Sequence, residues 1–181
     1  MKRLRTLALG LAALAIPAQA VALSCAQPSM ARLFDWARES GEAMVIGHGG
    51  LSHDGPRPAG PKVTYEQDET GGTRIVATGP TTATYRFEGD LLTPEGRLEK
   101  QSLTVTVEAI CLASWCGGFP ADLNDALIAL APTDDEEPYK LTVGPCPGEI
   151  DMVPSAAKVE ALERCMAADN CGPTEHKMFD N

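Results

Sequence analysis

The chain has 181 residues, of which 25 are acidic and 15 are basic, and its formal net charge is −10. A surface with this charge repels nucleic acid and anionic lipid, because binding to either needs clustered Lys and Arg. The length suits one domain with a single hydrophobic core. The composition therefore excludes nucleic acid as a partner and predicts one acidic globular domain.

The first residues have the three-part anatomy of a secretory signal peptide. A basic start at residues 2–5 precedes the apolar run Thr6–Ile16, and small residues follow at Ala18 and Ala20. The apolar run is shorter than the roughly 20 residues that a membrane-spanning helix needs. We therefore expect an exported protein that is periplasmic or secreted.

The end of the signal peptide falls between residues 20 and 24, because small residues occur at several suitable positions. We expect residues 1–20 to be removed and residues 21–181 to form a single globular domain. Cleavage after Ser24 would instead leave Cys25 as the first residue. Contact with a membrane is expected only if Cys25 carries a lipid.

Two helices and a strand-rich middle are expected along the rest of the chain. Apolar residues recur at helical spacing in Ser29–Ser40 and Ser155–Ala168, and each segment starts at a serine that can cap a helix. Strands are predicted by period-two alternation at Ala43–Gly47, Lys62–Gln67, Thr73–Thr78, Thr82–Leu92, Leu103–Cys111, Asp125–Ala131 and Tyr139–Val143. The glycine- and proline-rich segment Gly49–Pro61 is predicted to be a mobile surface loop.

These elements predict a mainly β (α+β) fold. We expect a small antiparallel, OB-like barrel with a short helix near each end, stapled by disulfides.

All six cysteines lie beyond the signal peptide, at Cys25, Cys111, Cys116, Cys146, Cys165 and Cys171. An even number in an oxidising compartment predicts three disulfides. Six cysteines allow 15 pairings, and the short turn between them favours Cys165 with Cys171. The other four cysteines would then form two bridges that tie the N-terminus to the sheet.

Few residues suggest chemistry. His48 and His53 are the candidate metal ligands, but they are five residues apart in a segment expected to be mobile, so we predict no metal site and no cofactor. The sequence Trp115-Cys116-Gly117 is similar to a thioredoxin active site, but Phe119 stands where the second cysteine would be. Nucleophile and phosphate-loop motifs are missing from the sequence. We therefore predict a stapled loop around Cys116 and a protein that is not an enzyme.

Several features taken in order resemble the netrin-like modules that include the tissue inhibitors of metalloproteinases. They are Cys25, a short helix, the strand Ala43–Gly47, a long strand ending in Cys111, the strand Asp125–Ala131, an acidic turn, the strand Tyr139–Val143 and Cys146. The resemblance implies an OB-fold barrel with a helix alongside and disulfides that join the N-terminal segment to the barrel. It also implies an inhibitor whose first residue, a cysteine, chelates the zinc of a protease. The Cys-x-Cys start of those inhibitors is absent, because Ala26 and Gln27 follow Cys25.

The sequence thus predicts an exported, non-enzymatic accessory or binding protein whose partner is a protein or a small ligand. One alternative is an inhibitor of an extracellular metalloprotease that acts through its N-terminal segment. A second alternative is a hydrolase or redox enzyme whose catalytic residues match no known motif.

Overall fold

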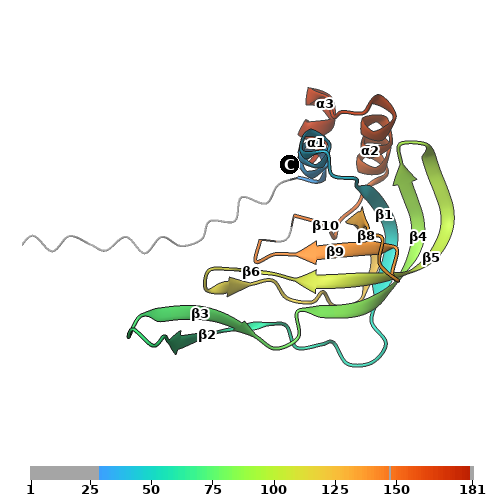
Figure 1. Ribbon diagram of the computed structural model, residues 1–181. Coiled ribbons are helices and arrows are strands. Elements are labelled where there is room, and N and C mark those ends of the chain that lie inside the picture. The colour runs from blue at the N-terminus through green and yellow to red at the C-terminus, as the bar shows by residue number, and fades with distance from the viewer. Residues whose placement is uncertain (1–28, 147, 180–181) are drawn as a thin grey trace, which may run out of the picture.

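The computed structural model describes residues 29–146 and 148–179. Its centre is a ring of five strands, in which each strand pairs with two neighbours (Figure 1). In order around the ring, the strands are β1 (Val45–Ser52), β4 (Thr82–Thr93), β5 (Gly96–Ala109), β9 (Tyr139–Val143) and β8 (Leu123–Pro132). The pairing of β1 with β8 closes the ring. The mainly β, OB-like barrel that the sequence predicts is therefore confirmed.

The ring is antiparallel except where β5 runs parallel to β9. Side chains from alternate positions fill its interior, as period two requires. Val105, Val107 and Ala109 of β5 point inward together with Tyr85 and Phe87 of β4, and all five are buried. The short strand β10 (Ile150–Asp151) extends the sheet next to β8.

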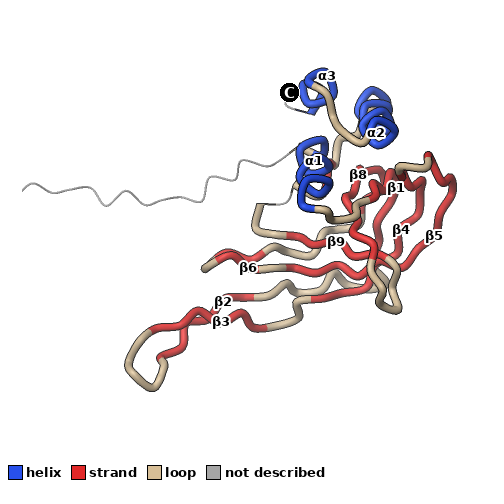
Figure 2. The backbone as a smooth tube through the Cα atoms, turned by 45° about the horizontal axis from the view of Figure 1, so that its top comes forward, coloured by secondary structure: helices blue, strands red, loops and turns tan. Residues whose placement is uncertain are grey.

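Three helices lie together at one end of the barrel (Figures 1 and 2). They are α1 (Met30–Ser40), α2 (Ala156–Ala168) and α3 (Pro173–Phe179). They form a second core against β1, β4 and β8, in which Phe34 and Leu162 pack near Ile46, Leu92 and Leu127. Among the described residues, no helix is long and apolar enough to cross a membrane.

The two predicted helices are confirmed, with the predicted serines as caps. The Ser29 hydroxyl accepts from the Arg32 amide at 3.4 Å, and the Ser155 hydroxyl accepts from the Lys158 amide at 3.3 Å. Helix α3 was not among the elements predicted from the sequence. Proline has no amide hydrogen to lose at a first helical position, so Pro173 begins a helix rather than ending one.

The prediction that Gly49–Pro61 is a loop was wrong over its first residues. Strand β1 continues through the glycines to Ser52, whereas the predicted strand ended at Gly47. Gly49 lies opposite Gly89 of β4, and a Cβ atom added to either would lie 2.3 Å from a carbonyl oxygen of the other strand. The two strands approach this closely only because both residues are glycine.

Two hairpins project from the barrel, away from the three helices (Figures 1 and 2). The longer pairs β2 (Lys62–Gln67) with β3 (Thr73–Thr78), and both strands have the predicted bounds. The shorter pairs β6 (Cys111–Leu112) with β7 (Trp115–Cys116). Strand β2 contacts β7, so the hairpins are neighbours.

Candidate binding site

The two histidines that the sequence singled out occupy separate environments. His48 lies within β1, and its Nε2 atom is 3.2 Å from Oδ1 of Asp125 on β8. His53 follows β1; its backbone amide donates to Oδ1 of Asp122 at 3.0 Å, and its ring meets Tyr85 edge-on at 5.2 Å. Within residues 29–146 and 148–179, no three His, Cys, Asp or Glu side chains are grouped as a metal site would require.

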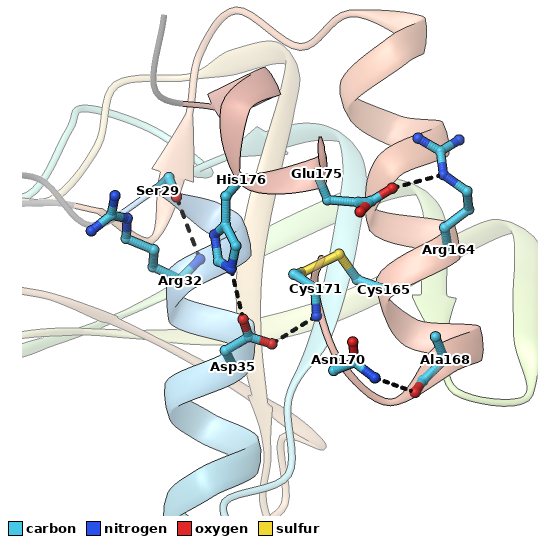
Figure 3. Close-up of a disulfide and its surroundings, with 10 residues drawn as sticks. All are labelled: Ser29, Arg32, Asp35, Arg164, Cys165, Ala168, Asn170, Cys171, Glu175 and His176. Carbon is cyan, nitrogen blue, oxygen red and sulfur yellow. Dashed lines mark hydrogen bonds and ion pairs between the residues drawn. A yellow bond between two sulfur atoms is a disulfide. The ribbon is translucent and has the colours of Figure 1, made fainter. Parts of the chain in front are cut away.

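The disulfides agree with the sequence prediction in one pair and differ in another. Cys165 is bonded to Cys171, as predicted (Figure 3). Cys111 is bonded to Cys116, its direct partner across the β6–β7 hairpin, so this bridge does not tie the N-terminus to the sheet as expected. Cys146 is also disulfide-bonded. Cys25, on which the inhibitor alternative depends, lies outside the described residues.

The bridge between Cys111 and Cys116 confirms a stapled loop after the long strand. The two cysteines face each other because a tight turn reverses the chain between Leu112 and Trp115. The positive φ angle of 51° at Ala113 belongs to this turn.

Around the second bridge, Asp35 of α1 holds the C-terminal helices in place (Figure 3). One oxygen of its carboxylate accepts from the Cys171 amide at 2.9 Å, and the other lies 2.9 Å from Nε2 of His176. A neighbouring ion pair joins Arg164 to Glu175 at 3.1 Å. Both carboxylate oxygens of Asp35 are bonded to groups near the second disulfide, so we assign this cluster a structural role.

A cavity of about 660 Å³ opens where the chain enters α1, between β7, the end of β9 and the β10 region. Its lining is mostly apolar and includes Met30, Phe119, Leu123, Val143, Met152 and Phe179. These side chains come from segments that are distant in sequence, so the closed ring and the helices create the cavity together.

Two close approaches shape one wall of this cavity. A Cβ atom on Gly117 would lie 2.0 Å from the carbonyl oxygen of Val143, so only glycine lets the segment after β7 pack on β9. The buried Tyr85 hydroxyl donates to the Pro120 carbonyl at 2.9 Å and fixes the next part of the same segment. Burial raises the pKa of Tyr85 above its usual value of 10.0, against the opposing effect of the nearby positive charge of Arg57.

Three charged side chains line the cavity: Arg57, Asp151 and Lys158. Nζ of Lys158 lies 2.6 Å from Oδ2 of Asp151, and both side chains are about four-fifths buried, at 18% and 20% exposure. The same Nζ donates to the Val153 carbonyl at 3.4 Å and lies 5.6 Å from the centre of the Phe179 ring. Arg57 is in the loop between β1 and β2 and has no ion-pair partner among the described residues.

Large apolar side chains are exposed in the cavity lining and on the two hairpins. Met152 and Val153 line the cavity and are 70% and 75% exposed. The two hairpins expose four more, Tyr65, Ile75, Leu112 and Trp115. Exposed apolar surface of this kind is often a place where ligands or partners bind.

The sequence did not predict this cavity. The pair Gly117-Gly118 after Cys116 was interpreted as part of a stapled loop. Arg57 lies in the segment that was expected to be a mobile loop, and Asp151 and Lys158 belong to no motif.

Comparison of the chain with protein-family models, with curated proteins and with solved structures found no match. The resemblance to netrin-like modules therefore stays a prediction.

Proposed function

We propose that this chain is an exported, non-enzymatic binding protein of the periplasm or the extracellular space, and that the cavity beside α1 is its ligand site. The observation that carries the proposal is the cavity itself. Its volume of about 660 Å³ lies within the range of roughly 300–1,000 Å³ typical of ligand sites, and a mostly apolar lining with a few polar groups is also typical.

Two further features support this function. The described cysteines are all in disulfides, which persist in oxidising compartments outside the cytoplasm. In addition, no histidine of the described residues lines the cavity, and Asp151 and Lys158 are paired with each other. This arrangement favours binding over acid–base catalysis, which needs an acid or base that faces the substrate.

The test uses a neutral apolar dye, N-phenyl-1-naphthylamine, whose fluorescence rises when it leaves water. We expect saturable binding to the folded protein. An Ala121→Trp variant should weaken it strongly, because Ala121 is exposed and lines the cavity, so the indole would fill ligand space. The matched control is Ala167→Trp, since Ala167 is exposed on α2 and does not line the cavity.

Dye binding that is saturable and lost only in Ala121→Trp would support the proposal. Equal binding by both variants would place the dye elsewhere and contradict the cavity as the ligand site. An absence of saturable binding to the unaltered protein would also contradict it. Circular dichroism and thermal melting of both variants would show that the barrel is intact.

A further inference from the structure

We propose that the cavity selects an amphipathic monocarboxylate, that is, a small molecule with an unbranched apolar chain ending in one carboxylate, such as a medium-chain fatty acid. This inference rests on the proposed function and adds the chemistry of the ligand. Arg57 is the group that would receive the carboxylate.

The charged side chains of the lining favour a ligand with one negative charge. Among the described residues, only Arg57, Asp151 and Lys158 bring charge to its lining. The ion pair at 2.6 Å cancels Asp151 against Lys158, which leaves the positive charge of Arg57. The lining of the cavity therefore carries one net positive charge, on a chain whose net charge is −10. A ligand with a single negative charge complements it, whereas a dianion would leave one charge without a partner.

The hydrogen-bond donors of Arg57 and Lys158 favour a carboxylate. No described residue accepts a hydrogen bond from the Arg57 side chain in the structure. Its guanidinium group offers a planar fork of donors that matches a carboxylate with two parallel bonds. Lys158 uses two of its three hydrogen-bond donors on Asp151 and the Val153 carbonyl, so it can donate at most one hydrogen bond to a ligand. The geometry thus points to a carboxylate at Arg57.

The apolar lining defines the rest of the ligand. Phe119 lines the cavity and is buried, at 1% exposure. Met152 and Val153 give the rim an apolar surface that water covers in the free protein. An alkyl chain that replaces this water gains free energy in proportion to the apolar area that it covers. A polar ligand such as a sugar would leave its hydroxyl groups without partners against the same wall.

The experiment compares decanoate with decanol, which share the alkyl chain and differ in charge. Both compete against N-phenyl-1-naphthylamine, and calorimetry gives their dissociation constants at pH 7. We expect decanoate to bind about tenfold more tightly, the usual effect of one charge-assisted pair. In Arg57→Gln the two constants should become equal, because decanoate loses affinity while decanol does not. The matched control is Arg86→Gln, since Arg86 is exposed on β4 and outside this cavity.

Three outcomes would overturn the inference: decanol binding as tightly as decanoate, an unchanged preference in Arg57→Gln, or a preference lost equally in Arg86→Gln. Each of these can occur while the dye still binds, and in that case the cavity remains a ligand site and only the carboxylate is wrong. Failure of dye binding itself would contradict the proposed function. An Arg57→Lys variant refines the result, because it keeps the charge without the planar fork and should retain only part of the preference.

Discussion

The two described disulfides should contribute unequally to stability, although they close loops of nearly the same length. The loops contain six residues between Cys111 and Cys116, and seven between Cys165 and Cys171, ends included. In the chain-entropy account, closing such loops in the unfolded state stabilises the fold by about 2.2 and about 2.4 kcal/mol. Loop entropy alone therefore predicts almost no difference between them.

The two bridges differ in how deeply they are buried. Cys165 and Cys171 are 1% and 9% exposed within the core between the helices and the barrel, whereas Cys111 and Cys116 are half-buried in their hairpin. At Cys165 and Cys171, replacement by alanine also removes a buried sulfur atom. Each such atom contributes about 1 kcal/mol if sulfur is taken as comparable to a methylene group. We therefore expect a loss of roughly 4 kcal/mol for the Cys165→Ala/Cys171→Ala pair and roughly 2 kcal/mol for Cys111→Ala/Cys116→Ala.

Urea denaturation of the two double variants and the unaltered protein measures this difference. The dependence of the free energy of unfolding on urea should stay similar in all three, so that the midpoints report stability. Equal losses would show that the helical core adds nothing beyond loop closure. A larger loss for the hairpin pair would refute the structural role that we assign to the cluster around Cys171.

Three further predictions concern single side chains. Burial raises the pKa of Glu149 above its usual 4.5, and its Oε2 atom has no hydrogen-bond partner among the described residues. Ionisation of Glu149 therefore destabilises the fold as the pH rises through the raised pKa. Glu149→Gln should raise Tm at pH 7–8, and the gain should vanish near pH 4. Gly49→Ala should lower the free energy of unfolding by about 1–3 kcal/mol in urea denaturation, because the added Cβ would overlap the backbone of β4. Gly118→Ala should be nearly neutral, because the nearest atom to its added Cβ is at the flexible end of the Arg57 side chain. Asp35→Ala should cost about 1–3 kcal/mol, because the Cys171 amide and His176 lose their acceptor; a loss below 0.5 kcal/mol, the size of an ordinary surface change, would contradict this.

Most of the secondary structure could be predicted because its signals are local. Ser29 and Gly41 bound α1 through a capping hydroxyl and a left-handed φ of 74°, and both are properties of single residues in sequence. The β2–β3 hairpin and β9 follow from alternation and turn residues alone, and their bounds match the prediction. In each of these elements the residues that decide the outcome are neighbours in sequence.

Strand β1 shows where local reasoning failed. Glycines interrupt the pattern from Gly47 onward, so the sequence favours a loop. In the structure, Gly47 lies under the ring of Phe87, with only 2.8 Å between that ring and the place of a Cβ atom. Gly49 meets Gly89 in the same way. The partner residues are some 40 positions away, so nothing near the glycines in sequence indicates that they allow a close approach of two paired strands.

The cavity could not be predicted for the same reason. Its charged groups lie in a loop, a short strand and a helix. Only the folded chain pairs Lys158 with Asp151 and leaves Arg57 with no oppositely charged partner among the described residues. Its wall depends on Gly117 packing against Val143 and on Tyr85 binding the Pro120 carbonyl. All of these contacts require the ring to be closed first. The cavity is therefore a consequence of barrel closure and not of a motif, and substitutions that disturb closure should alter ligand binding even when they lie far from Arg57.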